Sequence, residues 1–317
     1  MSVNPQYNGP INTANPIPDG ESRISIYGFK PSLALAAVAL ATFAIITILH
    51  IWYIFKSRLT RSFQILLAFG SLMELVGYGF RAGSAKNPFK VINFIIQYFM
   101  IVCAPVFYTT ALYLSLLYII RRLRRESLWI TPLSPKAMLW TFATIDVVTT
   151  ALQICGAALI GVSESKRADG EVPPISTESA NNILLAGLAI QNFSFLVFLS
   201  IFAVIVFRNS KIRSHGGTHE KPFSAGDGNN GYSGETIGRD EAGLLDKLPK
   251  SYIWVVTISS LALFLRTLFR LAETADGVFG FASTSEAYFG VLEYAPVVVG
   301  IGLWAALPLY RMLHARH

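Results

Sequence analysis

Seven long apolar stretches dominate this chain, and each is long enough to cross a lipid bilayer. They cover residues 33–55, 63–80, 91–119, 137–161, 182–207, 251–271 and 285–309. About 20 predominantly apolar residues cross the hydrocarbon core as a helix. Helices are required there because hydrocarbon offers no partner for the backbone groups of an open strand edge. The sequence therefore predicts an all-α polytopic membrane protein, a bundle of seven transmembrane helices.

These stretches contain ionisable residues that a lipid-facing helix does not tolerate. The charged residues within them or at their ends are Glu74, Arg81, Asp146, Arg266, Arg270, Glu273, Glu286 and Glu293. A charge at the centre of a bilayer costs about 2.5–3.5 kcal/mol on insertion scales, so such residues usually face a bundle interior or a wet cavity. We therefore expect the functional site among them.

Composition agrees with a membrane domain. The chain has 317 residues, of which 53% are hydrophobic and only 14% charged, whereas soluble domains have about 25% charged residues. Cys103 and Cys155 lie inside apolar stretches, so we expect two buried thiols and neither a disulfide framework nor a cysteine-based zinc site. No cleavable signal peptide is visible in the first thirty residues, and the first span is expected to act as the insertion signal.

The positive residues predict the orientation. With the N-terminus outside, 17 of the 26 Lys and Arg residues fall in cytosolic connections and 7 on the outer side, as the positive-inside rule requires. Topology thus explains the net charge of +7, and no nucleic-acid partner is expected. The predicted regions are an extracellular polar segment 1–32, helices in 33–207, a flexible cytosolic linker 208–250, helices in 251–310 and a cytosolic tail 311–317.

Polar residues of the second span lie on one helical stripe. Glu74, Gly77, Tyr78 and Arg81 follow the spacing i, i+3, i+4, i+7. Glu74 and Arg81 are two turns apart, which is too far for an easy direct pair. We expect each to meet a partner on another helix, although Arg81 has the alternative of extending its side chain to the outer interface.

The sixth and seventh spans carry the densest charges. Arg266, Arg270 and Glu273 share one stripe, and Glu286 and Glu293 are seven residues apart. Glu74, Asp146, Glu286 and Glu293 are available as partner carboxylates for the arginines. The resulting network of five acids and three arginines fits either a binding site for an amphiphile with an ammonium group or a structural lock between helices.

Further polar signals lie in the third, fourth and fifth spans. Pro105 lies midway along the third span, where a proline kinks the helix and frees a backbone carbonyl. Asp146 and Gln153 share a face of the fourth span, and the fifth span carries Gln191. Gln153 and Gln191 are placed to hydrogen-bond between helices, a modest stabilisation of about 0.6 kcal/mol on average.

Enzymatic and metal sites lack the residues they need. A seven-span zinc hydrolase needs three intramembrane ligands, usually histidines, yet only His50 lies in a span. No G-x-x-x-x-G-K-[ST] phosphate loop and no placed Ser/His/Asp set is present. We therefore predict that the protein is not an enzyme and binds no cofactor or metal ion. Detection of a covalently altered lipid product would count against this prediction.

A series of short motifs runs along the chain: Tyr27-Gly28-x-x-Pro31-Ser32, His50, Glu74-x-x-Gly77-Tyr78-x-x-Arg81, Ala104-Pro105, Asp146 with Gln153-x-x-Gly156, Gly187-x-x-x-Gln191, Phe269-Arg270-x-x-Glu273-x-x-x-Gly277, and Glu286 followed by Glu293. In their order and their placement on successive spans, these motifs resemble those of the fungal lipid-translocating exporter family. The resemblance covers nearly the whole membrane domain. This sequence departs from the family pattern in two places. Gly290 stands where the family often has an aromatic residue, and the long linker 208–250 looks specific to this chain.

The resemblance implies seven helices with an outer N-terminus and a role in moving or sensing amphipathic lipids or resisting toxic ones. It also implies membrane lipids as partners and a location in the plasma membrane. Our first hypothesis is an exporter whose cationic cargo enters from the cytosolic leaflet and meets Glu273, Glu293 or Glu74. Arg270 and Arg266 would hold the empty carboxylates. The alternative is a lipid-sensing receptor that signals through the linker 208–250. The sequence predicts no particular protein partner.

Overall fold

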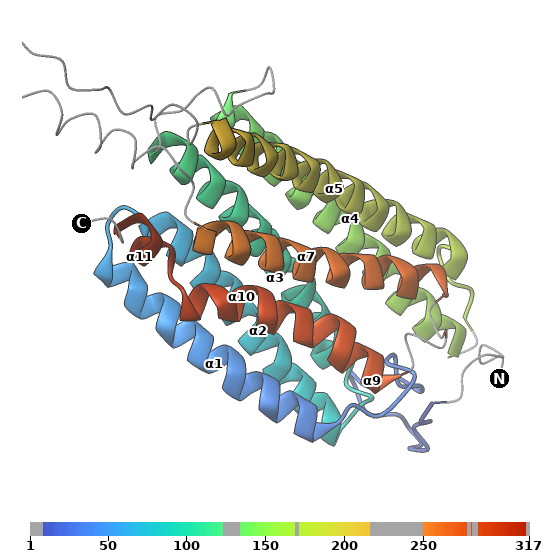
Figure 1. Ribbon diagram of the computed structural model, residues 1–317. Coiled ribbons are helices and arrows are strands. Elements are labelled where there is room, and N and C mark those ends of the chain that lie inside the picture. The colour runs from blue at the N-terminus through green and yellow to red at the C-terminus, as the bar shows by residue number, and fades with distance from the viewer. Residues whose placement is uncertain are drawn as a thin grey trace, which may run out of the picture.

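The computed structural model describes residues 9–122, 134–168, 171–215, 250–277, 280 and 285–314. Over these ranges the chain forms helices that lie side by side in one bundle (Figure 1). They are α1 (Leu33–Lys56), α2 (Arg61–Lys86), α3 (Val91–Arg122), α4 (Pro135–Ala168), α5 (Thr177–His215), α7 (Lys250–Ala275), α9 (Glu286–Tyr288), the π-helix η2 (Phe289–Tyr294), α10 (Ala295–Ala306) and α11 (Leu309–His314). Within the described ranges, seven helices are long and apolar enough to cross a membrane, and α9, η2 and α10 together make the seventh. The predicted seven-span, all-α fold is confirmed.

Apolar side chains cover the outside of the bundle, and charged side chains lie inside it. Ile48, Phe55 and Trp140 are 66%, 79% and 71% exposed, whereas Glu74 and Arg81 are each 1% exposed. This distribution is the reverse of that in a water-soluble bundle. It suits a lipid environment because lipid tails are as apolar as leucine side chains, while a charge facing them is costly.

The long helices form a ring in the order of the chain. Each packs on the next from α1 to α5, α5 packs on α7, and α7 packs on α10, which returns to α1. In Figure 1, α1 and α5 lie at opposite edges of the bundle. Helix α3 also contacts α7 across the ring. Most of the buried charged residues of the described ranges lie on α2, α7 and η2.

Residues 9–32 pack across the end of the bundle at which α1 begins. We call this end of the bundle its N-terminal end. Ser22 N–H donates to the C=O of Phe89 at 2.9 Å, and Val91 N–H donates to the C=O of Gly20 at 3.2 Å. These bonds join the segment to the connection between α2 and α3. Ile24 in the segment is only 2% exposed. The described part of the predicted polar segment therefore belongs to the folded domain.

Two helices continue beyond their predicted spans. Helix α4 extends to Ala168 and α5 begins at Thr177 and ends at His215, whereas the apolar stretches end at 161 and 207. The first residues of the predicted linker 208–250 are thus helical. Residues 216–249, where the rest of that linker falls, lie outside the described ranges.

Gly156 brings α4 into direct contact with the backbone of α5. A Cβ atom at this position would lie 2.7 Å from the backbone nitrogen of Leu184 and 2.9 Å from its Cα. We expect Gly156→Ala to lower the Tm of the detergent-purified protein by several degrees. Overpacking costs about 1–3 kcal/mol, which exceeds the roughly 1 kcal/mol that alanine gains over glycine in a helix.

The matched control for this substitution is Gly302→Ala in α10, where an added Cβ would meet no atom within 4 Å. Its Tm should equal or exceed that of the unmodified protein, because only the helix propensity changes. A Tm for Gly156→Ala as high as that of the control would contradict the close approach of α4 and α5.

Candidate functional site

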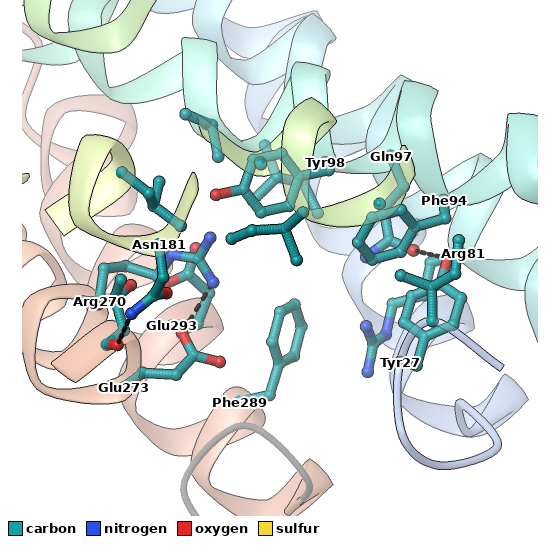
Figure 2. A pocket seen from close by; sticks show the side chains of 18 of the residues that line it. Tyr27, Arg81, Phe94, Gln97, Tyr98, Asn181, Arg270, Glu273, Phe289 and Glu293 are labelled. Atoms are coloured by element: carbon teal, nitrogen blue, oxygen red, sulfur yellow. Dashed lines mark hydrogen bonds and ion pairs between the residues drawn. The ribbon is translucent and has the colours of Figure 1, made fainter. Parts of the chain in front are cut away.

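A cavity of about 150 Å³ lies inside the bundle near its N-terminal end (Figure 2). Side chains from the segment before α1 and from α2, α3, α4, α5, α7 and η2 line it. The cavity is large enough for a small polar headgroup.

Aromatic side chains form much of the cavity wall. Tyr27, Phe94, Tyr98 and Phe289 all line it (Figure 2). The Tyr27 hydroxyl donates to Oε1 of Gln97 at 2.7 Å and lies 2.8 Å from Oγ of Ser84. Burial raises the pKa of Tyr27 to about 12. The hydroxyl therefore stays neutral and keeps its proton for the bond to Gln97, which fixes the segment before α1 onto α3.

Charged side chains from three elements also line the cavity. They are Arg81, Arg270, Glu273 and Glu293. Arg270 pairs with Glu273 one turn along α7 at 2.8 Å, and its guanidinium carbon lies 5.2 Å from the centroid of the Tyr98 ring. The two side chains of this pair are 17% and 15% exposed. Both members of this pair are therefore partly accessible.

Arg266 on α7 joins three other elements deeper in the bundle. Its Nη2 atom lies 2.6 Å from Oε1 of Glu293 on η2 and 3.8 Å from Oε1 of Glu74 on α2. The same nitrogen donates to the C=O of Ile101 on α3 at 2.8 Å. Pro105, four residues further along α3, has no N–H group to bond that carbonyl. The mid-span proline thereby provides an acceptor for the buried arginine.

Arg81 connects α2 to the start of the seventh span. Its Nη2 atom lies 3.1 Å from Oε1 of Glu286, and its guanidinium carbon lies 4.0 Å from the ring centroid of Phe289. Glu286 also accepts a hydrogen bond from the N–H of Ser32, the N-cap residue of α1, at 2.8 Å. Arg81 thus pairs inside the bundle and does not extend to the interface. The prediction that Glu74 and Arg81 meet partners on other helices is confirmed.

Three of the predicted site residues lie away from the cavity. Asp146 accepts hydrogen bonds from the hydroxyls of Thr109 and Tyr113 at 2.6 and 3.1 Å. It was one of the four carboxylates available to the arginines, but within the described ranges it forms no salt bridge because it faces these α3 hydroxyls. Gln153 donates to Gln191 at 2.6 Å between α4 and α5, as the sequence predicts.

The other predicted residues lie on the cavity wall or directly behind it. Tyr78 is behind the wall, where its ring stacks on Phe43 of α1 with centroids 5.6 Å apart and meets Tyr294 edge-on at 5.8 Å. Glu74, Arg266 and Glu286 do not line the cavity. Arg266 and Glu286 pair with residues that do, and Glu74 pairs with Arg266. Arg81, Arg270, Glu273 and Glu293 line it.

Sequence reasoning missed residues that close the cavity at the N-terminal end. Tyr27, Gln97, Asn181 and Phe289 line it and are absent from the predicted set. Tyr27 belongs to the Tyr-Gly-x-x-Pro-Ser motif, and Gln97 is a polar residue inside an apolar stretch, so both carried a usable signal. Asn181 donates to the C=O of Thr274 at 3.1 Å, and nothing in its local sequence indicates that contact.

No group of three or more His, Cys, Asp or Glu side chains that suits a metal ion occurs among the described residues. His50 lies far from the cavity, near the end of α1, and its Nδ1 atom is 2.7 Å from Oε1 of Gln64 on α2. This contact makes His50 a packing residue between two helices.

Comparisons with known proteins agree with the motifs. The sequence model of the family described as RTA1 like protein matches residues 67–316. The sphingoid long-chain base transporter RSB1 of Saccharomyces cerevisiae strain Lalvin EC1118 is 27% identical over 278 residues, which are 85% of this chain and 69% of that protein. Protein RTM1 of Saccharomyces cerevisiae is 25% identical over 76% of this chain and 66% of its own length. Protoporphyrin uptake protein 1 of the same species is 23% identical over 73% of this chain and 64% of its own length.

No solved structure matches the chain. The family match covers most of the chain, from within α2 to beyond α11, and so includes the helices that carry the buried charges. The predicted resemblance is confirmed. This chain belongs to the RTA1-like protein family.

Proposed function

We propose that this protein is a membrane transporter that exports single-chain amphipathic lipids with a cationic head, such as sphingoid long-chain bases. Membership of the family and the similarity to a protein named as a sphingoid long-chain base transporter support the proposal. The observation that carries it is the cavity, where the carboxylates of Glu273 and Glu293 share a small space with aromatic rings.

The ammonium headgroup binds at Glu273 in this proposal. In the empty protein Arg270 holds that carboxylate at 2.8 Å, so headgroup and arginine compete for one acid. The rings of Tyr98 and Phe289 line the same cavity, and aromatic faces attract cations within about 6 Å. The site therefore offers a cationic head both a counter-charge and aromatic contacts.

The lipid tail remains in the membrane. A cavity of about 150 Å³ holds a headgroup and the first carbons of a chain. Ala157, Ile160 and Leu184, from α4 and α5, line it and provide an apolar side for those carbons. This arrangement selects amphiphiles by their heads and tolerates different chain lengths.

The predicted orientation places the N-terminal end, and with it the cavity, on the outer side. Cargo that enters between helices from the cytosolic leaflet would then leave from this cavity. Export at the plasma membrane lowers the cellular concentration of a toxic amphiphile. Resistance to such compounds is therefore part of the same proposal.

Efflux of a labelled long-chain base from cells tests the assignment of Glu273. We expect Glu273→Gln to reduce the efflux rate at low cargo concentration by about ten-fold or more. A charge-assisted hydrogen bond contributes about 1.5–3 kcal/mol, and each 1.4 kcal/mol is a factor of ten in affinity. The variant should fold, since glutamine keeps the shape of the side chain and its neighbour Arg270 retains partial access to water.

Glu164→Gln is the matched control. Glu164 is also a buried acid near the N-terminal end, accepts a hydrogen bond from Thr177 at 2.7 Å and does not line the cavity. Its efflux should match that of the unmodified protein at equal surface expression. Unchanged efflux in Glu273→Gln would remove Glu273 from the site, and no efflux above empty cells for any form would contradict export of this cargo.

A further inference from the structure

Two buried carboxylates share one arginine on the inner side of the cavity. Glu74 and Glu293 are each 1% exposed and Arg266 is 3% exposed. Nη2 of Arg266 is 2.6 Å from Oε1 of Glu293 but 3.8 Å from Oε1 of Glu74, which is too long for a hydrogen bond. Oε1 of Glu74 and Oε2 of Glu293 are buried with no hydrogen-bond partner among the described residues. If both acids were ionised, the trio would carry one uncompensated negative charge.

The surrounding groups do not supply the missing positive charge. Arg270 is paired with Glu273 and Arg81 with Glu286. The titratable and charged groups that face the two carboxylates are Tyr78 on α2, Tyr98 and Tyr108 on α3, and Arg266, Arg270 and Glu273 on α7. Among the described residues, three arginines therefore meet four glutamates at this site, and the surplus acid is in the trio.

We propose that Glu74 and Glu293 form a proton-binding site that exchanges one proton for one cationic headgroup. The inference rests on the proposed export function and adds its coupling ion. A buried carboxylate without a counter-charge takes up a proton, because the desolvated charged form is strongly disfavoured. Glu74 is the acid that carries this proton, since Glu293 already has the short, charge-assisted contact with Arg266.

The exchange needs only a small movement of Arg266. Glu273 and Glu293 line the same cavity, so an ammonium group held at Glu273 meets the carboxylate of Glu293 as well. Arg266 then turns from Glu293 toward Glu74, across the present separation of 3.8 Å. The O–H bond of Glu74 breaks, and its proton leaves to water as the arginine takes its place.

The charges balance in both states. In the empty protein the charges of Arg266, ionised Glu293 and protonated Glu74 sum to zero. In the loaded protein the charges of Arg266, the two carboxylates Glu74 and Glu293, and the bound ammonium group also sum to zero. A proton that returns to Glu74 sends Arg266 back to Glu293 and expels the headgroup, so the exchange is one for one and electroneutral. A low pH on the side of the membrane to which the cavity opens therefore favours release of the cargo.

Liposomes containing the purified full chain test the exchange. The probe is radiolabelled N,N,N-trimethylsphingosine, whose permanent charge makes it indifferent to pH. Equal potassium on both sides with valinomycin holds the membrane potential at zero. With the lumen one pH unit more acidic than the outside, one-for-one exchange should concentrate the probe in the lumen about ten-fold, because a ten-fold proton ratio balances a ten-fold cargo ratio. Uptake should be accompanied by an equal number of protons leaving the lumen.

Glu74→Gln separates transport from coupling. The amide cannot bind the proton, and no buried charge is left without a partner, so we expect a folded protein. The probe should still enter down its gradient, but it should reach a ratio of about one and move no protons. Glu164→Gln, outside the cavity, should retain the ten-fold ratio.

The outcomes distinguish the two proposals. Entry of the probe into liposomes with the unmodified protein, but only to a ratio of about one and without proton movement, would overturn proton exchange and leave export standing. A ten-fold ratio that persists in Glu74→Gln would remove Glu74 from the exchange. No entry above protein-free liposomes at any pH would overturn the export function and this inference with it.

Discussion

Replacement of Arg266 by leucine is expected to destabilise the protein by about 3–5 kcal/mol, the usual cost of leaving buried charge without its partner. The substitution removes the contacts to Glu293 at 2.6 Å, to Glu74 at 3.8 Å and to the Ile101 carbonyl at 2.8 Å. The measurement is the Tm and the yield of monodisperse protein in detergent. A loss of this size should leave little folded material.

Removing the acids as well should reverse most of this loss. The triple variant Arg266→Leu, Glu74→Gln, Glu293→Gln contains no uncompensated charge in the trio, and buried ion pairs replaced by neutral groups often cost little. Lys166→Leu is the control, because its pair with Glu171 is on the surface, with side chains 46% and 65% exposed, and such pairs contribute about 0–1 kcal/mol. A single Arg266→Leu variant as stable as this control would contradict the described trio.

Replacement of Arg81 by leucine is expected to cost about 2–3 kcal/mol. Its partner Glu286 is 25% exposed, so the penalty should be below that of a fully buried pair. The substitution also removes the contact of the guanidinium with Phe289 at 4.0 Å, and a cation on an aromatic ring contributes about 2 kcal/mol when desolvated. Both effects should appear as a lower Tm of the purified protein.

Two companion variants separate these effects. Adding Glu286→Gln to Arg81→Leu should recover only part of the Tm, because it removes the unpaired acid but does not restore the contact with Phe289. Arg81→Lys keeps the charge but loses the planar group that stacks on the ring. Its Tm should lie between the Tm of Arg81→Leu and that of the unmodified protein. Complete recovery with Glu286→Gln would show that the ring contact contributes nothing.

Hydropathy and charge placement were enough to predict the fold and several contacts between buried polar residues. Each apolar stretch is a helix because hydrocarbon leaves the backbone no other way to satisfy its hydrogen bonds. Glu74 and Arg81 are too far apart on α2 to pair easily, so partners on other helices were predicted, and Arg266 and Glu286 are those partners. The contact between Gln153 and Gln191 was predicted in the same way.

Local patterns could not predict which acid each arginine selects. Asp146 was as acceptable a partner as Glu293 by sequence, but α4 turns it toward Thr109 and Tyr113. The π-helix η2 and the packing of residues 9–32 across the cavity were also not predicted. These features depend on how helices rotate against one another, and spacing along one helix contains no information about that rotation.

The sequence by itself determined that this chain is a seven-helix membrane bundle with charges in its interior, because the cost of polar groups in hydrocarbon permits few other arrangements. Only the tertiary structure decided that Glu273 and Glu293 line a cavity, that Glu74 lies behind it and that Arg266 lies between the two acids of the trio. Several helices surround that cavity, and their contacts are set by the packing of whole helix faces. The four glutamates and three arginines at the cavity can be listed from the sequence, but the helix packing determines that the surplus acid is in the trio.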